Sequence, residues 1–159
     1  MQLQQSFTVA LVADTHNLVR PELLRFVAGC DAIVHAGDVC SAPVLDALAA
    51  LAPLTAVRGN NDRGEWAQTL PVQTTLEIGG TKIAVVHELP DLRRDPVAEG
   101  IAVVVSGHSH KPSCEMRDGV LYVNPGSAGP RRFRLPVTAA RLTIGNDGAL
   151  SVESSRLVE

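Results

Sequence analysis

Histidine, aspartate and asparagine side chains recur in short clusters along this chain, beside glycine or other turn residues. Imidazole and carboxylate ligands without a thiolate suit Mn, Fe or Zn in a reactive site more than a structural zinc. An amide such as that of Asn60 adds an oxygen ligand without cancelling positive charge. The clusters are Asp14-Thr15-His16, Gly37-Asp38, Gly59-Asn60-Asn61-Asp62, His87 and Gly107-His108-Ser109-His110. These residue types predict a metal centre.

Two of the clusters carry ligand residues two positions apart, namely Asp14 with His16 and His108 with His110. In extended backbone such side chains point to one side, roughly 6.6 Å apart at about 3.3 Å per residue, and can converge on ions about 3.5–4 Å apart. Two divalent ions held by two carboxylates, Asp14 and Asp38, keep a net charge of about +2, which binds phosphate and lowers the pKa of a bridging water. This charge balance favours hydrolysis over metal storage.

The elements that position these clusters follow from apolar patterning. Short apolar, β-branched runs predict strands, and amphipathic segments between them predict helices. The predicted order is a strand over 7–13, a helix over 21–27, a strand over 32–35, a helix over 43–52 and a strand over 55–58. This alternation implies parallel strands with right-handed crossovers. The clusters fall at the carboxyl ends of strands, where α/β sheets bind ligands, and glycines 37, 59 and 107 let the backbone approach a crowded centre.

After residue 70, strands predominate. The Gly79-Gly80 pair supplies the positive φ of a tight turn, so the segments 72–78 and 82–87 predict a β-hairpin. A short helix is predicted over 91–99, and strands over 101–105, 111–116, 120–123, 137–144 and 150–153. We therefore expect an α/β first half, a β-rich second half, and two sheets packed face to face with helices outside.

Length and composition narrow the class of protein. The 159 residues, without linker or repeat, fit a single domain over 1–159. The net charge of -3 gives no reason to expect a nucleic-acid partner, and no apolar run suits a membrane span. Three widely spaced cysteines argue against a disulfide framework, and the N-terminus has no secretory signal pattern. We therefore expect a cytoplasmic protein.

Taken together and in this order, the motifs resemble those of the calcineurin-like metallophosphoesterases. The matching residues are Asp14-x-His16, Gly37-Asp38, Gly59-Asn60-x-Asp62, His87 and Gly107-His108-x-His110. The chain length and the segment Val123-Asn124-Pro125-Gly126-Ser127 are similar to the small bacterial and archaeal phosphodiesterase branch, and the resemblance runs from about residue 7 to residue 145. It implies an α/β fold, a four-layer α-β-β-α sandwich of two mixed β-sheets flanked by helices.

The resemblance also implies a role for each motif. One ion would be held by Asp14, His16 and His110 and the other by Asn60, His87 and His108, with Asp38 bridging both. The implied reaction is in-line attack on the phosphorus of a small phosphate ester by a metal-bridging hydroxide. Mn is the expected metal, with Fe, Ni or Zn as alternatives, because all four accept these ligands. Such relatives are often homo-oligomers.

Two positions depart from the family pattern. Asn61 stands where many members carry a histidine that protonates the leaving group, and because an amide cannot shuttle a proton, the carboxyl of Asp62 is an alternative acid. Glu88 stands where glycine is common, and we expect it to narrow substrate choice. A monoester carries an additional negative charge, so these departures favour a diester. The expected catalytic residues are Asp38, Asn60, Asn61 and Asp62.

Other interpretations remain beside these. His35 is expected to be a hydrogen-bonded core residue or to orient Asp38. The Asn124-Pro125-Gly126 segment is a turn signature whose backbone amides can border the site. The cluster of Arg131, Arg132 and Arg134 is expected on a solvated surface, with a phosphate clamp as the alternative. Alternative functions are a phosphomonoesterase, a non-catalytic interaction scaffold and a metal-binding regulatory module.

Overall fold

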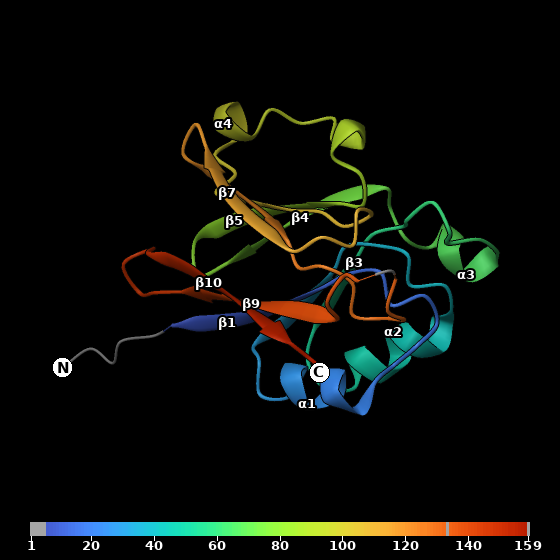
Figure 1. Cartoon of the computed structure of the whole chain (residues 1–159). Coiled ribbons are helices and arrows are strands. Elements are labelled where there is room, and N and C mark those ends of the chain that lie inside the picture. Colours follow the sequence, from blue (N-terminus) through green and yellow to red (C-terminus); the bar gives the residue numbers. More distant parts are fainter. Residues whose placement is uncertain (1–5, 133, 159) are drawn as a thin grey trace.

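The computed structural model describes residues 6–132 and 134–158, which form two five-stranded sheets packed face to face (Figure 1). The first sheet has the order β10-β9-β1-β2-β3 and the second β4-β5-β6-β8-β7. The first comprises β1 (Phe7–Val12), β2 (Ala32–His35), β3 (Leu54–Ala56), β9 (Thr138–Ile144) and β10 (Leu150–Arg156). The second comprises β4 (Gln73–Ile78), β5 (Thr81–Val86), β6 (Val103–Val105), β7 (Ser113–Arg117) and β8 (Val120–Asn124). The helices are α1 (Pro21–Val27), α2 (Ala42–Ala49), α3 (Glu65–Gln68), α4 (Pro96–Glu99) and the 3₁₀ helix η1 (Leu89–Asp91).

Both sheets mix parallel and antiparallel pairs. The strands β1, β2 and β3 are parallel, as the alternation of strands and helices predicts. The late strand β9 returns to pair antiparallel with β1, placing Leu142 opposite Val9, and β10 pairs antiparallel with β9. In the second sheet β5, β6 and β8 are parallel, with β4 and β7 antiparallel at the two edges.

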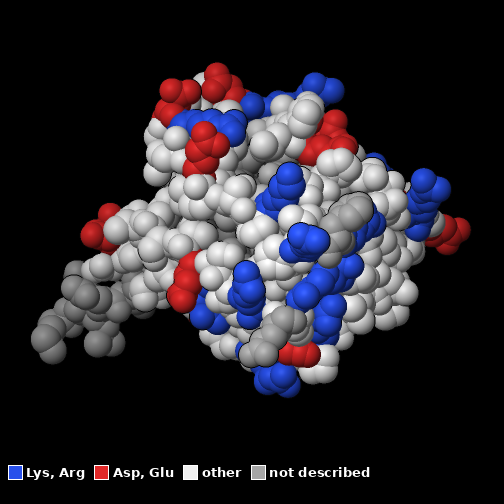
Figure 2. Space-filling model, viewed as in Figure 1, with Lys and Arg blue, Asp and Glu red and all other residues white. Residues whose placement is uncertain are grey.

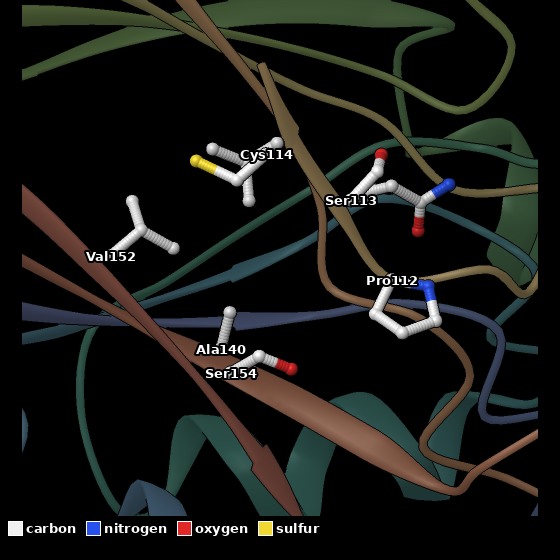
Figure 3. Close-up of a pocket in the computed structure, with 8 residues that line it drawn as sticks. Pro112, Ser113, Cys114, Ala140, Val152 and Ser154 are labelled. Carbon is white, nitrogen blue, oxygen red and sulfur yellow. The ribbon is translucent and has the colours of Figure 1, made fainter.

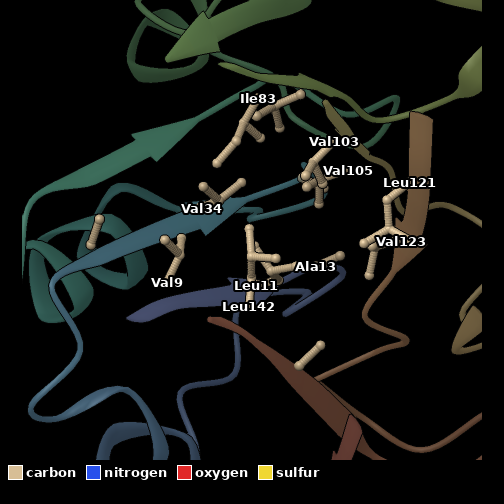
Figure 4. Close-up of a cluster of buried hydrophobic side chains, with 14 of the residues drawn as sticks. Val9, Leu11, Ala13, Val34, Ile83, Val103, Val105, Leu121, Val123 and Leu142 are labelled. Carbon is tan, nitrogen blue, oxygen red and sulfur yellow. The ribbon is translucent and has the colours of Figure 1, made fainter. Parts of the chain in front are cut away.

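The apolar side chains between the two sheets form the main core (Figure 4). Alternation along β1 directs Val9 and Leu11 into this layer. There they belong to one buried cluster with Ile83 of β5 and Val103 of β6. Burying each side chain of this size contributes about 1.5–3 kcal/mol, so this layer holds the two sheets together.

Helices cover the outer faces of both sheets. The alternate residues of β1, Ala10 and Val12, point away from the second sheet and pack with Leu23 of α1 and Leu48 of α2. A smaller cluster that includes Val104 lies on the outer face of the second sheet, on the side of α4 (Figure 1). The four-layer α-β-β-α sandwich is therefore confirmed.

The prediction of one helix over 91–99 is wrong. The chain instead forms η1, an irregular stretch, and then α4, which begins at Pro96 after the N-cap Asp95. Proline lacks an N–H group and restricts the preceding residue to extended conformations, so no helix continues through Asp95. The side chain of Asp95 accepts a hydrogen bond from Ala98 N at 3.3 Å. No pattern predicts α3, because four residues are too few to show helical periodicity.

The other predicted elements are confirmed, with boundaries that differ by up to three residues. The strand predicted over 111–116 begins only at Ser113, after Pro112. Within the described ranges, no helix has the length and apolar character that crossing a bilayer requires.

Candidate metal centre

The predicted donor side chains follow strands of both sheets at one end of the sandwich. The donors, with the strand that each follows, are Asp14 and His16 (β1), Asp38 (β2), Asn60 (β3), His87 (β5), and His108 and His110 (β6). Backbone hydrogen bonds of 3.0 Å join the loops, from Asp14 N to Gly37 O and from Gly107 N to His87 O. The packing of the two sheets therefore brings donors from both halves of the chain to one centre.

The backbone of these loops adopts the left-handed region at many non-glycine positions. The described part of the chain has eight such positions, of which seven lie in the loops of this centre. They are Asp14 (φ 56°), His16 (46°), Asn17 (69°), Asp38 (57°), Cys40 (76°), His108 (74°) and His110 (64°). Such conformations cost on the order of 1–3 kcal/mol each and persist where the surrounding structure enforces them, which is common at functional sites.

Three glycines let the loops meet without collision, as their positions predict. A Cβ atom on Gly59 would lie 2.2 Å from Oδ1 of Asp38. One on Gly37 would lie 2.8 Å from Nδ1 of His87, and one on Gly107 would lie 3.0 Å from Oδ2 of Asp14. Real Cβ atoms essentially never make contacts under 3.0 Å, so no side chain fits at Gly37 or Gly59 without displacing a donor.

Asp14, His16 and His110 form the first group of converging donors. The Nε2 atoms of the two histidines are 3.3 Å apart, and they lie 3.8 and 3.6 Å from Oδ1 of Asp14. Burial lowers the pKa of both histidines, and the charge of Arg132 contributes to bringing that of His110 to about 4. Both rings are therefore neutral at pH 7, as metal ligation requires.

Asp14, Asp38 and His87 form the second group, which shares Asp14 with the first. Nε2 of His87 lies 3.3 Å from Oδ2 of Asp38 and 3.9 Å from Oδ1 of Asp14. The same nitrogen is 3.0 Å from Oδ1 of Asn60. Nδ1 of His87 donates to Ala36 O at 2.8 Å, which orients the ring with Nε2 toward the carboxylates. Burial opposes protonation of His87, but the two carboxylates raise its pKa above the usual value.

Asp38 lies between the two groups. Its Oδ2 is 3.6 Å from Nε2 of His16 and 3.3 Å from Nε2 of His87. Asn61 donates to both carboxylate oxygens at 2.9 Å, to Oδ1 from its backbone N and to Oδ2 from its side-chain amide. Burial opposes ionisation, but the hydrogen bonds from His87 and Asn61 hold the pKa of Asp38 below its usual range. Asp38 is therefore a charged oxygen donor close to both groups.

Asp62, considered above as an acid, contacts the backbone. Its Oδ2 accepts from Asp38 N at 3.0 Å and from Gly59 N at 2.8 Å, and its Oδ1 accepts from Cys40 N at 2.7 Å. These three hydrogen bonds fix the loop that carries Asp38. The contacts of Asp62, like those of Asn61, are those of positioning residues. No side chain is therefore assigned as the proton donor to a leaving group.

His35 is fully buried beneath the centre and links two of its loops. The Thr15 hydroxyl donates to Val39 O at 3.2 Å, so it accepts from Nε2 of His35 at 3.0 Å. Nδ1 of His35 then accepts from Gly37 N at 3.1 Å. Burial, with the nearby charge of His87, lowers the pKa of His35 to about 3, which keeps this tautomer neutral. Both expected roles are combined, because this buried residue also holds the loop that carries Asp38.

The segment that starts at Asn124, the last residue of β8, borders the centre through side chains, whereas its turn signature suggested backbone amides. Nδ2 of Asn124 donates to Gly107 O at 3.0 Å, and the Ser127 hydroxyl donates to Asp14 O at 3.0 Å. Gly129 packs so closely that a Cβ atom there would lie 2.2 Å from Thr15 O. Nothing local in the sequence signals the contact of Ser127, because its partner lies 113 residues away.

His108 lies beside the second group and belongs to neither. Its backbone N donates to Oδ2 of Asp14 at 3.1 Å, and its ring centroid is 5.2 Å from that of His87. Its Nε2 lies 3.0 Å from Oε1 of Glu88. The other predicted ligands contact one another directly, so the ring of His108 is the one predicted donor at the margin of the centre.

Two hollows adjoin the centre and meet at Ser109. One, of about 320 Å³, has Glu88, His108 and Asn124 in its wall. The other, of about 640 Å³, is lined by Ser109, Lys111, Arg134 and Leu135. Figure 2 shows Lys and Arg side chains gathered on this face around the segment between β8 and β9, whereas Asp and Glu lie mainly toward its margin.

A third hollow, of about 280 Å³, opens between the sheets at their β7 and β10 edges (Figure 3). Its lining residues are Pro112, Ser113, Cys114, Val123, Asn124, Ala140, Val152 and Ser154. None of these residues carries a charge, and none is a predicted ligand. This hollow is therefore not part of the candidate metal centre.

The residues of the centre fit divalent cations. Oδ1 of Asp14 and Nδ1 of His110 are buried without a hydrogen-bond partner. Leaving such a group unpaired costs about 1–3 kcal/mol, more when it is charged, and burial raises the pKa of Asp14 to about 7. A cation bound by Asp14 would offset this cost. Nitrogen and oxygen donors without thiolate suit Mn, Fe, Ni or Zn.

Metal affinity should fall as the pH decreases through 7. A metal-binding Asp14 must be ionised and His87 must be neutral, whereas in the metal-free protein both pKa values are raised, that of Asp14 to about 7. Below pH 7 each displaced proton should therefore weaken Mn²⁺ binding about tenfold per pH unit. Calorimetric titrations at pH 6 and 8, in two buffers of different ionisation enthalpy, would measure the protons released. An affinity that is constant between pH 5.5 and 7.5 would contradict this expectation.

Comparisons with known proteins show which family and which folds this chain resembles. A family model described as the calcineurin-like phosphoesterase superfamily domain matches residues 7–147. A protein of Methanocaldococcus jannaschii named "Probable metallophosphoesterase" is 35% identical over 132 residues, which cover 75% of this chain and 67% of the relative. A solved structure from Streptococcus pneumoniae TIGR4, described as a predicted phosphoesterase, has a TM-score of 0.74 at 26% identity, covering 96% of this chain and 91% of that one.

Vacuolar Protein Sorting 29 from Cryptosporidium parvum is also similar, with a TM-score of 0.76 over 97% of this chain and 99% of that one. Its identity to this chain is 19%, so the likeness shows the fold alone.

Proposed function

Because the chain belongs to the calcineurin-like phosphoesterase superfamily, we propose that it is a two-metal phosphoesterase that hydrolyses phosphodiesters. The observation that carries the proposal is the pair of donor groups that share Asp14, with Asp38 between them. One ion would be held by Asp14, His16 and His110, and the other by Asn60, His87 and His108. Asp38 would contact both, because its Oδ2 faces one histidine of each group.

The chemistry divides between the ions and the chain. Two divalent ions, Mn by preference, would supply Lewis acidity that activates water and neutralises the phosphoryl oxygens. The chain holds their donors in place, because Asn61 fixes both oxygens of Asp38 and Ala36 O fixes the ring of His87. The positive charge of Arg132 interacts electrostatically with both Asp14 and His110. The same charge would attract a phosphate anion to the centre.

The two hollows support a diester as the substrate. A phosphodiester has two organic substituents on phosphorus, and the two hollows share Ser109, which lies between His108 and His110 in the sequence, in their walls. One substituent would lie against Glu88, and the other would lie along the basic groove of Lys111 and Arg134. A monoester has one substituent and an additional negative charge, so it would leave one hollow empty and face Glu88 with more charge.

Metal-stripped protein should regain hydrolysis of bis-p-nitrophenyl phosphate when Mn²⁺ is added. We expect kcat/KM for this diester to exceed that for p-nitrophenyl phosphate by about tenfold or more, which corresponds to about 1.4 kcal/mol of transition-state stabilisation. Initial rates with both esters, with and without Mn²⁺, measure the preference. Faster turnover of the monoester would keep the metal centre and make the protein a phosphatase. Bound metal without turnover of either ester would instead favour a scaffold or regulatory role.

A further inference from the structure

The basic groove of Lys111 and Arg134 opens beside the metal centre. Lys111 directly follows the predicted ligand His110, and Arg134 lies two residues after Arg132. We infer that this groove binds a second phosphate group of the substrate. The preferred diester then carries a further phosphate on the substituent that lies in the groove. The inference rests on the proposed function and extends it to a class of substrates, the phosphorylated phosphodiesters.

The positive charges of the basic groove face solvent without a carboxylate partner. Lys111 and Arg134 are exposed, and within the described part of the chain no carboxylate forms an ion pair with either. By contrast, the exposed Arg117 of β7 pairs with Glu115 at 2.8 Å. Lys and Arg gather on this face although the whole chain has a net charge of -3 (Figure 2). Such unpaired cations can bind an anion without first breaking an ion pair.

Lys111 is held beside the centre by hydrogen bonds of its own loop. Its backbone N donates to the Ser109 hydroxyl at 3.2 Å, and Nδ2 of Asn124 donates to the same oxygen at 3.1 Å. Asn124 also donates to Gly107 O at 3.0 Å. The Lys111 ammonium group therefore extends from a fixed backbone, one residue beyond His110.

Arg132 connects the charge of the basic groove with the centre. After burial, the charge of Arg132 is the largest cause of the lowered pKa of His110, about 4, so its guanidinium lies close to the centre. Leu135 N donates to Arg132 O at 3.1 Å, and this turn also carries Arg134. Two residues span roughly 7 Å at most, so a phosphate at the centre and a second one in the groove can belong to one small molecule.

The opposite charges of the two hollows determine how such a substrate lies. Glu88 in the wall of the other hollow would repel a second phosphate. Guanidinium and ammonium groups instead bind phosphate through charge-assisted hydrogen bonds. The phosphorylated substituent therefore occupies the basic groove, and the uncharged substituent lies beside Glu88.

Matched pairs of p-nitrophenyl diesters test this inference. One pair is the p-nitrophenyl ester of thymidine 5′-phosphate with and without a 3′-phosphate, and the other is p-nitrophenyl propyl phosphate with and without a terminal phosphate on the propyl group. With Mn²⁺-loaded wild type we expect the further phosphate to raise kcat/KM about tenfold. Added salt should reduce this preference, because it screens exposed charges. A preference in both pairs shows that the phosphate alone is recognised, a preference in the thymidine pair alone assigns the groove to nucleotides, and no preference in either pair overturns the inference.

Substitution of Arg134 connects the preference to the basic groove. In Arg134→Ala the kcat/KM ratio within each pair should fall close to one, and Arg134→Lys should keep part of the preference because it keeps the charge. Arg117→Ala is the matched control, since it removes an exposed arginine of β7, and it should keep the wild-type ratio. A wild-type ratio in Arg134→Ala would contradict the assignment.

Calorimetry separates a failure of this inference from a failure of the proposed function. The protein is titrated in Mn²⁺ buffer with thymidine 3′,5′-bisphosphate and with thymidine 5′-phosphate. If the wild type hydrolyses no diester, the proposed reaction fails, while the two titrations still decide the role of the groove. A lower Kd for the bisphosphate in the wild type but not in Arg134→Ala supports the second phosphate site, and equal Kd values in the wild type overturn it.

Discussion

Replacing Asp38 by alanine should abolish metal-dependent phosphoesterase activity. Oδ2 of Asp38 lies 3.6 Å from Nε2 of His16 and 3.3 Å from Nε2 of His87, so this carboxylate faces both donor groups. Its loss removes the proposed bridging ligand and one of the two negative charges that balance the ions. We expect at least one ion to be lost and kcat/KM to fall by about a thousandfold or more, since metal centres supply several kcal/mol of transition-state stabilisation. Elemental analysis and initial rates measure the two effects.

The control for this substitution is Asp46→Ala, which removes an exposed carboxylate from helix α2. It should keep both ions and full activity. Metal-free Asp38→Ala should still fold, because the substitution removes the Asp38 carboxylate, whose repulsion adds to the effect of burial in raising the pKa of Asp14. Circular dichroism of the metal-free protein checks this point. An Asp38→Ala protein with both ions and wild-type rates would refute the proposed centre.

Substituting alanine for Gly59 should damage both activity and stability. The added Cβ would lie 2.2 Å from Oδ1 and 2.4 Å from the backbone N of Asp38, so the loop carrying this carboxylate must move. Overpacking of this kind costs about 1–3 kcal/mol. Because Asp38 and the neighbouring Asn60 are displaced together, we expect a loss of at least about a hundredfold in kcat/KM, in line with the effect of misplacing a reacting group. Urea unfolding and initial rates measure the two losses separately.

A second glycine separates crowding from backbone strain. Gly29 has a φ of 84°, and a Cβ atom there would meet nothing within 4 Å. Gly29→Ala should therefore lose about 1–2 kcal/mol of stability through its left-handed backbone alone, and it should keep full activity. If Gly59→Ala lost stability but kept its kcat/KM, the close approach of this loop to Asp38 would have no role in the reaction.

The positioning contacts around Asp38 explain how the centre is held before any ion binds. Asn61 donates to both carboxylate oxygens, and Asp62 accepts from the backbone N–H groups of Asp38, Gly59 and Cys40. His35 joins the same loop to the loop after β1 through Thr15 and Gly37. A rigid loop is needed because repulsion and burial otherwise drive buried carboxylates apart or cause them to take up protons.

Local patterns in the sequence determined most of the elements and the location of the donors. The run of apolar residues over 7–13 and the Gly79-Gly80 turn predict β1 and the β4–β5 hairpin, because strand alternation and turn chemistry depend on residues a few positions apart. The same short-range logic places the histidines and aspartates at strand ends. The motif order indicated the family, and through it the four-layer sandwich that the two sheets form.

Only the tertiary structure decided which side chains become partners. The pairing of β9 with β1, the hydrogen bond from Ser127 to Asp14 O and the contact of Glu88 with His108 each join segments separated along the chain. The two amides of Asn61 likewise meet Asp38 from a different loop. Such contacts depend on how two sheets stack and on where their loops then lie. They are determined by packing between segments far apart in the sequence, so they cannot be predicted from neighbouring residues alone. The sequence therefore supplied the donor side chains, and the packing of the two sheets determined their geometry.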